Sequence, residues 1–209
     1  ESNEFYMSGN FDAAYVYVRL DYNYNIGYHV NLGDIQICKN TFYMDGTTAT
    51  GIDIDDIYVE YLYGGTVSFG VLNMSENTMY GGGYGIDFFG YLYELNNTQA
   101  SVGDVIIESN ILINQTSSGM YIDYYDVEYL YGNTGVTCGD LIVRGNTITS
   151  YYSADGVYVS DIGYWYDFYD YASLEVGNVR IEENEIDVGG DGIYFYGYEV
   201  GEDLYDNSS

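Results

Sequence analysis

The chain has 209 residues, of which 47% are hydrophobic, so it is long enough and apolar enough to bury a core of its own. It contains 30 Tyr, 27 Gly and no Pro, and its 33 Asp and Glu against four Lys and Arg give a formal net charge of −29. Because nucleic acids and anionic membranes are bound through basic patches, this charge argues against both as partners and leaves cations, sugars or further copies of the chain.

A three-part pattern recurs along the whole chain, roughly every 35 residues. Each copy has an apolar alternation ending in Asn, a variable loop, a Gly that opens a second alternation with a tyrosine-rich stretch, and a third alternation closing on Gly. Short segments with a two-residue period are typical of a solenoid. The sequence therefore predicts an all-β fold, a single parallel β-helix (β-solenoid) of about six coils with three short strands per coil and uncapped ends. The predicted coils cover residues 1–33, 34–70, 71–103, 104–139, 140–177 and 178–209.

An antiparallel sandwich or barrel of short strands is the alternative fold, since Gly-rich turns would also allow it. However, chemically similar residues recur at matching positions of successive copies, which a sandwich has no reason to maintain. We expect them to form two inward columns, Ile35, Leu72, Val105, Leu141 and Val179 in one and Ile37, Met74, Ile107, Val143 and Ile181 in the other.

The Asn at the end of each first alternation is expected to mark a corner of the coil. Asn tolerates left-handed backbone, and its side-chain amide can bond to the Asn one coil above. Ordinary Asn turns without such a ladder are the alternative. The predicted corner column consists of Asn10, Asn40, Asn77, Asn110, Asn146 and Asn184.

The two cysteines fit neither a metal site nor a redox motif. Cys38 follows the inward Ile37, so its side chain is expected to point outward, where it could form a disulfide between two molecules. Cys138 takes an inward position, and we expect a buried thiol there. The two lie about two coils apart, near 10 Å along the axis, which is too far for a disulfide within one molecule.

Aspartates are densest in the segment GIDIDD, which contains Asp53, Asp55 and Asp56. Asp87 is expected one coil above Asp53. Carboxylates on adjacent coils repel each other at neutral pH unless a cation lies between them or one is protonated. The sequence therefore suggests calcium binding by these four residues, with a solvated acidic face as the alternative.

The word VEYLYG occurs at residues 59–64 and again at 127–132, with the near copy GYLYE at 90–94. Thirty tyrosines exceed what a narrow core lined by aliphatic residues can hold, so many must face outward as contact area with a polar hydroxyl. The words predict two outer columns, Tyr61, Tyr91 and Tyr129 in one and Tyr63, Tyr93 and Tyr131 in the other. The predicted assembly interface adds Tyr15, Tyr17, Tyr164, Tyr166, Tyr194 and Tyr196 to these six.

Four Asn-x-Ser/Thr triplets begin at Asn73, Asn96, Asn114 and Asn207, and they are candidate N-glycosylation sites. Strand sequences rich in Asn, Ser and Thr also generate such triplets by chance. No apolar run approaches the length of a membrane span, and no basic start precedes an apolar stretch. We therefore expect an extracellular or cell-surface chain from which the signal peptide has been removed.

Enzymes are common among β-helices, which makes catalysis the main competing function. Polysaccharide lyases need Lys or Arg beside the sugar, and hydrolases need a tight carboxylate cluster. The few bases include Arg144 and Arg180 on neighbouring coils, where they form no basic groove, and His29 is the single histidine. We expect no enzyme and no cofactor beyond calcium, and the alternative is a carbohydrate-binding or polysaccharide-degrading β-helix.

An acidic, proline-free, Tyr-rich stack with words such as DVIIESNILI, DLIVRGNTIT and NVRIEENEI resembles archaeal surface β-helix proteins, and the absence of caps resembles the sheath proteins of methanogenic archaea. The resemblance implies amyloid-like β-structure in stacked hoops around the cell, without catalytic residues. We therefore expect an extracellular structural protein that assembles with itself, head-to-tail through open β-edges and laterally through Tyr-rich faces. Sheaths, hoops or filaments are the expected products, and glycans are the other candidate partner.

Overall fold

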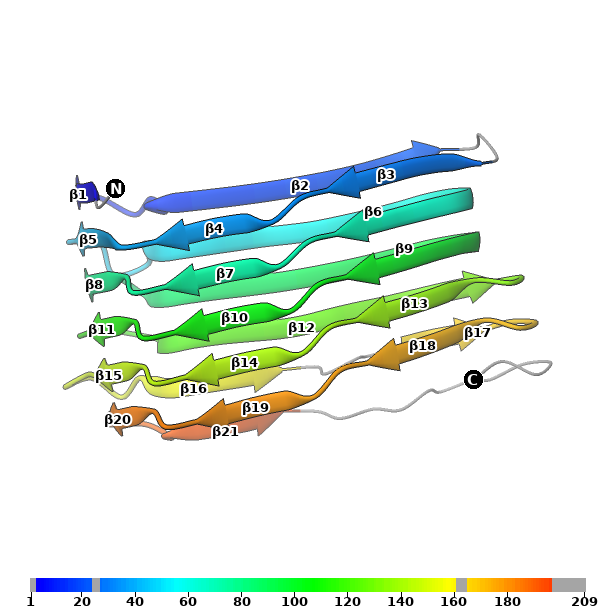
Figure 1. Ribbon diagram of the computed structural model, residues 1–209. Coiled ribbons are helices and arrows are strands. Elements are labelled where there is room, and N and C mark those ends of the chain that lie inside the picture. The colour runs from blue at the N-terminus through cyan, green and yellow to red at the C-terminus, as the bar shows by residue number, and fades with distance from the viewer. Residues whose placement is uncertain (1–2, 24–26, 161–164, 197–209) are drawn as a thin grey trace.

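The computed structural model describes residues 3–23, 27–160 and 165–196, and these residues form strands and no helix. The pairings link segments one repeat apart and are parallel, so the chain winds into a stack of coils (Figure 1). The predicted all-β parallel solenoid is therefore confirmed. Within the described ranges, no helix has the length and apolar character needed to cross a membrane.

Three sheets form the walls of the coil (Figure 1). The front sheet consists of β4 (Ile35–Cys38), β7 (Leu72–Ser75), β10 (Val105–Glu108), β14 (Leu141–Arg144) and β19 (Val179–Glu182). The corner sheet, at the left of Figure 1, consists of β1 (Asn3–Met7), β5 (Asn40–Met44), β8 (Thr78–Gly81), β11 (Ile111–Ile113), β15 (Thr147–Thr149) and β20 (Glu185–Asp187).

The third sheet runs along the back of the molecule, turns at the far end of the coil and returns on the front, and we call it the wrapping sheet (Figure 1). Its strands are β2 (Ala14–Asn23), β3 (Tyr28–Leu32), β6 (Thr50–Phe69), β9 (Tyr84–Val102), β12 (Ser118–Tyr131), β13 (Gly135–Cys138), β16 (Asp155–Ser160), β17 (Trp165–Phe168), β18 (Ser173–Val176) and β21 (Ile193–Tyr196).

The stack has about five turns, close to the six expected. The front sheet supplies five strands, one for each turn. The corner sheet has six strands because the described chain begins with a corner strand, β1, and continues past the last front strand into β20. β20 and β21 therefore begin a further turn.

The predicted inward columns are confirmed. Ile35 pairs in register with Leu72, which pairs with Val105, and the same holds along the rest of both columns. The middle members are fully buried, whereas those of the first and last turns are only partly covered. The core is therefore a continuous apolar column that is densest in the central turns.

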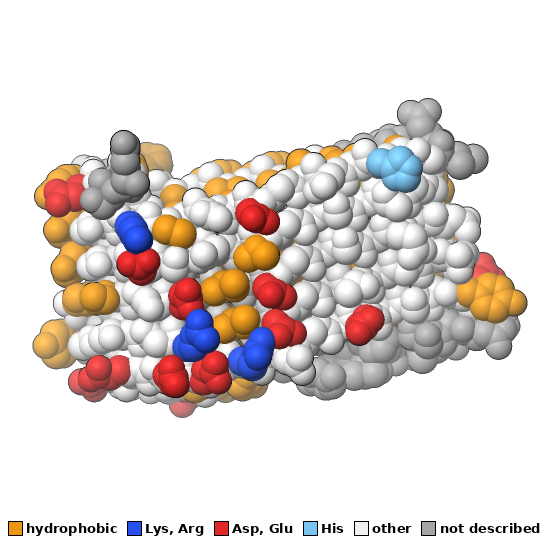
Figure 2. All heavy atoms as spheres, viewed as in Figure 1, with side chains coloured by type: hydrophobic (Ala, Val, Ile, Leu, Met, Phe, Trp, Pro, Cys, Tyr) orange, Lys and Arg blue, Asp and Glu red, His pale blue; other side chains and the backbone are white. Residues whose placement is uncertain are grey.

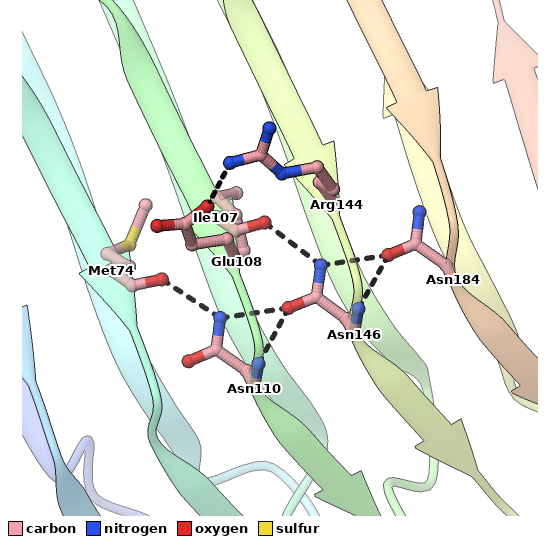
Figure 3. A network of polar contacts seen from close by, with 7 residues as sticks. All are labelled: Met74, Ile107, Glu108, Asn110, Arg144, Asn146 and Asn184. Atoms are coloured by element: carbon pink, nitrogen blue, oxygen red, sulfur yellow. Dashed lines mark hydrogen bonds and ion pairs between the residues drawn. The ribbon is translucent and has the colours of Figure 1, made fainter.

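The corner Asn column forms a hydrogen-bonded ladder (Figure 3). The Nδ2 of Asn110 donates to Oδ1 of Asn146 at 3.0 Å and to the carbonyl of Met74 at 2.9 Å, and its backbone N–H donates to the same Oδ1 at 2.9 Å. Asn77, Asn110 and Asn146 are buried, so the ladder satisfies polar groups that water does not reach.

We had expected the corner Asn itself to have left-handed backbone. In the structure, the residue before the Asn has that backbone instead. Positive φ angles occur just before the ladder, at Lys39, Glu76, Ser109, Gly145 and Glu183. The corner strand begins at the Asn itself in β5 and at the residue after the Asn in β8, β11, β15 and β20, while the Asn side chain bonds along the stack.

The first turn departs from the predicted alignment by seven residues. Asn3, not Asn10, pairs with Asn40 and donates to its Oδ1, so the segment NEFYM lies beside NTFYM. Asn10 lies outside the ladder, and its Oδ1 accepts a bond from the N–H of Thr48 at 3.4 Å.

The segment after each corner Asn forms a corner strand instead of the variable loop that the pattern predicted. The physical reason is a buried apolar residue two positions after the Asn, which closes the core at this end of the coil. These residues are Phe42, Met79, Leu112 and Ile148, each exposed by no more than 1%.

Two tyrosines in β12 are packed inside the coil next to a chain irregularity. Between Asp123 and Asp126, β12 spans three residue steps where β9 spans two, and Tyr124 and Tyr125 are both fully buried there. Gly90 of β9 provides the space, because a Cβ at that position would lie 2.4 Å from Cδ1 of Tyr125. Tyr124 donates to the carbonyl of Gly139 at 2.5 Å, whereas the Tyr125 hydroxyl has no hydrogen-bond partner.

Tyr125→Phe is therefore expected to raise the free energy of unfolding by about 1 to 2 kcal/mol, because it removes an unpaired buried hydroxyl. Tyr124→Phe is the matched control and should lower it by about 1 kcal/mol, because it leaves the Gly139 carbonyl without its partner. Urea denaturation followed by circular dichroism measures both. A destabilised Tyr125→Phe variant would contradict the inferred cost of the buried hydroxyl.

Candidate functional site

The tyrosines of the repeated words do not form the two predicted columns. The two VEYLYG copies do lie two turns apart in register, since Leu62 and Leu130 both pair with Leu95 of β9. GYLYE is displaced, however, because Tyr91 pairs with Tyr58. The three leucines must point inward where the coil turns, and this requirement, rather than the match of letters, sets the register.

The repeated segments VEYLYG and GYLYE instead form the far corner of the coil. Tyr61, Glu94, Tyr129 and Asp167 all have positive φ and follow one another turn by turn. Their neighbours pack edge to face: the ring centroid of Tyr93 lies 5.4 Å from that of Tyr61 and 5.3 Å from that of Tyr129. Tyr61, Tyr93 and Tyr129 therefore form a single zigzag cluster in place of the two straight columns.

Straight outward ladders occur elsewhere, and of their members Tyr194 is the one that the sequence analysis had placed in the predicted interface. Tyr6, Tyr43 and Tyr80 stack along the corner sheet at centroid distances of 4.6 and 4.9 Å. Along the back of the wrapping sheet, Tyr121, Tyr158 and Tyr194 stack at 4.9 and 5.0 Å. The signals were present in the matching words NEFYM and NTFYM and in GMYI, GVYV and GIYF.

The remaining predicted interface tyrosines are distributed over the back and the far end. Tyr15, Tyr17 and Tyr196 are exposed, and Tyr131 stacks on Tyr169 at 5.0 Å. Tyr63 donates to Glu94 at 2.6 Å. Tyr164 and the side chain of Tyr166 lie outside the described part of the chain.

The front of the molecule has a different character. Among the described strands β3, β4, β7, β10, β13, β14, β18 and β19, the single tyrosine is Tyr28. Acidic and basic side chains are interspersed over the front sheet (Figure 2). Lys39 pairs with Glu76 at 3.4 Å, Arg144 with Glu108 at 2.6 Å, and Arg180 with Asp140. Both arginines are therefore paired with carboxylates of a neighbouring turn.

Asp53 and Asp87 lie side by side on β6 and β9, as predicted, and they occupy two positions of the back tyrosine column. Burial, followed by repulsion from Asp87, Asp12 and Asp55, raises the pKa of Asp53 to about 7. Burial and the charges of Asp55 and Asp12 raise the pKa of Asp87 to about 6. Asp55 accepts a bond from the Tyr15 hydroxyl at 2.9 Å.

The geometry does not assemble these carboxylates into a cage. Within the described residues, no group of three or more His, Cys, Asp or Glu side chains is arranged to hold a metal ion. The side chain of Asp56 lies outside the described part. Calcium binding by the aspartates stays a hypothesis.

Because the pKa values of Asp53 and Asp87 are raised, the folded protein binds protons that the unfolded chain has already released between about pH 4 and pH 7. Their contribution to stability therefore grows as the pH falls from about 8 to about 5. At about pH 8, the free energy of unfolding of the double variant D53N/D87N should exceed that of the wild type by about 1 kcal/mol, after allowance for solvent screening. This difference should disappear as the pH falls to about 5.

Thermal unfolding of the wild type and of D53N/D87N, each at about pH 8 and about pH 5, measures this difference. An advantage that does not change with pH would contradict the assignment to these carboxyls. Calcium added at high pH should raise the melting temperature of the wild type but not of D53N/D87N if the pair binds the cation; equal shifts would place any bound calcium elsewhere.

Both cysteines are free thiols. Cys138 is buried as expected, and burial raises its pKa to about 12. Cys38 is half-buried, and its sulfur accepts a bond from the Ser75 hydroxyl at 3.2 Å. The intermolecular disulfide stays a prediction.

The candidate glycosylation sites differ in their surroundings. Asn73 lies on β7 with a buried, unpartnered Oδ1, and Asn96 accepts a bond from Asn97. Asn114 follows β11 at the corner of the coil, and Asn207 lies outside the described residues.

A groove of about 580 Å³ lies along the corner sheet. The ladder of Tyr6, Tyr43 and Tyr80 lines it together with the loops that follow the corner strands, and Asn114 and Tyr152 also line it. Hydrophobic side chains are visible at this end of the molecule (left in Figure 2).

Protein-family models, curated protein sequences and solved structures yield no match to this chain.

Proposed function

We propose that this chain is a non-enzymatic, extracellular structural protein that assembles with copies of itself into a sheath, hoop or filament of the cell envelope. The observation that carries the proposal is the set of outward tyrosine ladders. Tyr121, Tyr158 and Tyr194 run along the back, and the Tyr61, Tyr93 and Tyr129 cluster covers the far end. Tyrosine supplies a large contact area at low entropic cost and keeps a polar hydroxyl, which suits lateral contacts.

The strand edges support growth along the axis. Within the described residues, β19, β20 and β21 are paired on one side. Ile193 and Phe195 of β21 continue the buried column of Val157 and Val159, yet they are 46% and 53% exposed there. A further coil in the same register would pair these strands and cover this apolar surface.

Electron microscopy of the purified chain at micromolar concentration, with calcium and with a chelator, tests the proposal. Hoops, tubes or fibres with a meridional spacing of about 4.8 Å are expected. Phe195→Asp should shorten them, because it places a charge on the axial surface. Tyr158→Ser should separate filaments that associate laterally, without shortening the filaments. Monodisperse particles in both conditions would overturn the proposal.

Carbohydrate binding is the second candidate, and the groove beside Tyr6, Tyr43 and Tyr80 is the observation that favours it. A groove of this volume lies within the range of about 300 to 1,000 Å³ that small-ligand sites occupy. A screen of neutral and acidic polysaccharides for binding and for cleavage distinguishes this function from assembly.

A further inference from the structure

The corner groove contains one residue with an unsatisfied buried polar atom. Oδ1 of Asn114 is buried and has no hydrogen-bond partner. The backbone of Asn114 is in the left-handed region, with φ at 61°, and its N–H donates to the carbonyl of Thr149 at 2.7 Å. The backbone of Asn114 is therefore held in place, whereas no hydrogen bond holds its side-chain oxygen.

Asn114 also begins the triplet Asn114-Gln115-Thr116, and the structure holds the rest of this triplet firmly. The Thr116 hydroxyl donates to the carbonyls of Thr47 and Gly82, at 2.8 and 3.1 Å. Gln115 is buried, and its Nε2 donates to the carbonyl of Gly81 at 3.0 Å. Of the three described triplets, this one alone has its Asn in the groove.

The chemistry of the groove fits a neutral sugar. Among the described residues that line it there is no Lys, Arg or His, and Asp45 is one of them, so anionic ligands are repelled. The tyrosines that line it offer ring carbons together with hydroxyls, which match the apolar C–H face and the hydroxyl rim of a sugar ring.

The rung next to Asn114 offers an aromatic face. Tyr80 is the last ring of the corner ladder, and Ile113, the residue before Asn114, pairs with it in the next turn. One face of the Tyr80 ring stacks on Tyr43, and the other face is on the side of Ile113, whose side chain is smaller than a tyrosine ring. A sugar linked to Asn114 would therefore begin beside the ring of Tyr80, with Tyr152 lining the same groove.

We propose that Asn114 carries an N-linked glycan whose first sugars lie in the corner groove against Tyr80 and Tyr152. In the transfer, Nδ2 bonds to the anomeric carbon of an oligosaccharide activated as a lipid phosphate ester. The bond from that carbon to the phosphate oxygen breaks, the lipid phosphate leaves, and the amide proton passes to a base of the transferase. The glycan covers the corner sheet, so it leaves the back and far-end tyrosines available for assembly.

Expression of the chain in a secretory host that N-glycosylates Asn-x-Ser/Thr triplets tests this inference. Mass spectrometry of proteolytic peptides gives the occupancy at Asn73, Asn96 and Asn114, and Asn114 is expected to be occupied. The rate at which an amidase releases the Asn114 glycan from the folded chain should be lower, by about tenfold, than after denaturation. An unoccupied Asn114, or a release rate unaffected by folding, would overturn the proposal.

Two matched variants separate the groove contact from general folding. Tyr80→Leu should restore rapid release while the chain still unfolds cooperatively. Tyr6→Leu, which alters the same ladder two turns away from Tyr80 and three from Ile113, should leave the release slow. If both variants release the glycan at one rate, Tyr80 does not hold it and the proposed contact is wrong.

Discussion

Asn110→Ala is expected to lower the free energy of unfolding by about 4 kcal/mol. The substitution removes two bonds donated by Nδ2, to Met74 and Asn146, and two accepted by Oδ1 from Asn77. It leaves the Met74 carbonyl and both donors of Asn77 buried without these partners, and each such group costs about 1 to 3 kcal/mol.

Asn184→Ala is the control for this prediction. Asn184 belongs to the same ladder but is only half-buried, so water can replace part of what is lost, and about half the effect is expected. Urea denaturation and hydrogen exchange of the amides in β7, β10 and β14 measure the two losses. Equal losses at both positions would show that burial does not set the cost of breaking the ladder.

Gly119→Ala is expected to destabilise the chain by about 3 kcal/mol for a purely steric reason. A Cβ at Gly119 would lie 2.5 Å from Cγ2 of Ile148 and 2.7 Å from the carbonyl oxygen of Gly156 in the next turn. The φ angle of Gly119 is not in the left-handed region, so backbone strain plays no part. Backbone cannot yield at one rung without shifting the strands that it pairs with.

Gly192→Ala provides the matched test. Gly192 follows Gly156 in the same column of glycines, but a Cβ there would meet nothing within 4 Å. Its substitution should leave the melting temperature nearly unchanged, whereas Gly119→Ala should lower it by several degrees. A similar loss for both would indicate that the glycines act through chain entropy rather than through close approach.

The repeat and its inward columns could be predicted because burial ties them to one register. Leu72, Val105 and Leu141 alternate with outward residues, and a slip of one residue would place all of them in solvent. The ladder Asn was recognisable because its hydrogen bonds along the stack require an Asn on every turn. Asn10 was misassigned because it ends an alternation, as the true ladder residues do.

The outward tyrosines could not be placed by the same reasoning. A residue that faces solvent is not bound to a register by burial, and β6 and β12 each contain an irregularity before the VEYLYG word. The two VEYLYG copies therefore share one register, whereas GYLYE of β9 is displaced from both. Tyr6 and Tyr43 could have been found, because their strands share Asn, Phe, Tyr and Met at matching positions.

The asparagine ladder gives the stack a direction. Each Asn donates from Nδ2 to Oδ1 of the next, from Asn3 through to Asn184, so the two edges present the opposite ends of one chain of dipoles. A copy that continued this chain could dock in one orientation only, since a reversed copy would set donor against donor or acceptor against acceptor. A fibre built in this way would be polar, and its two tips should elongate at unequal rates.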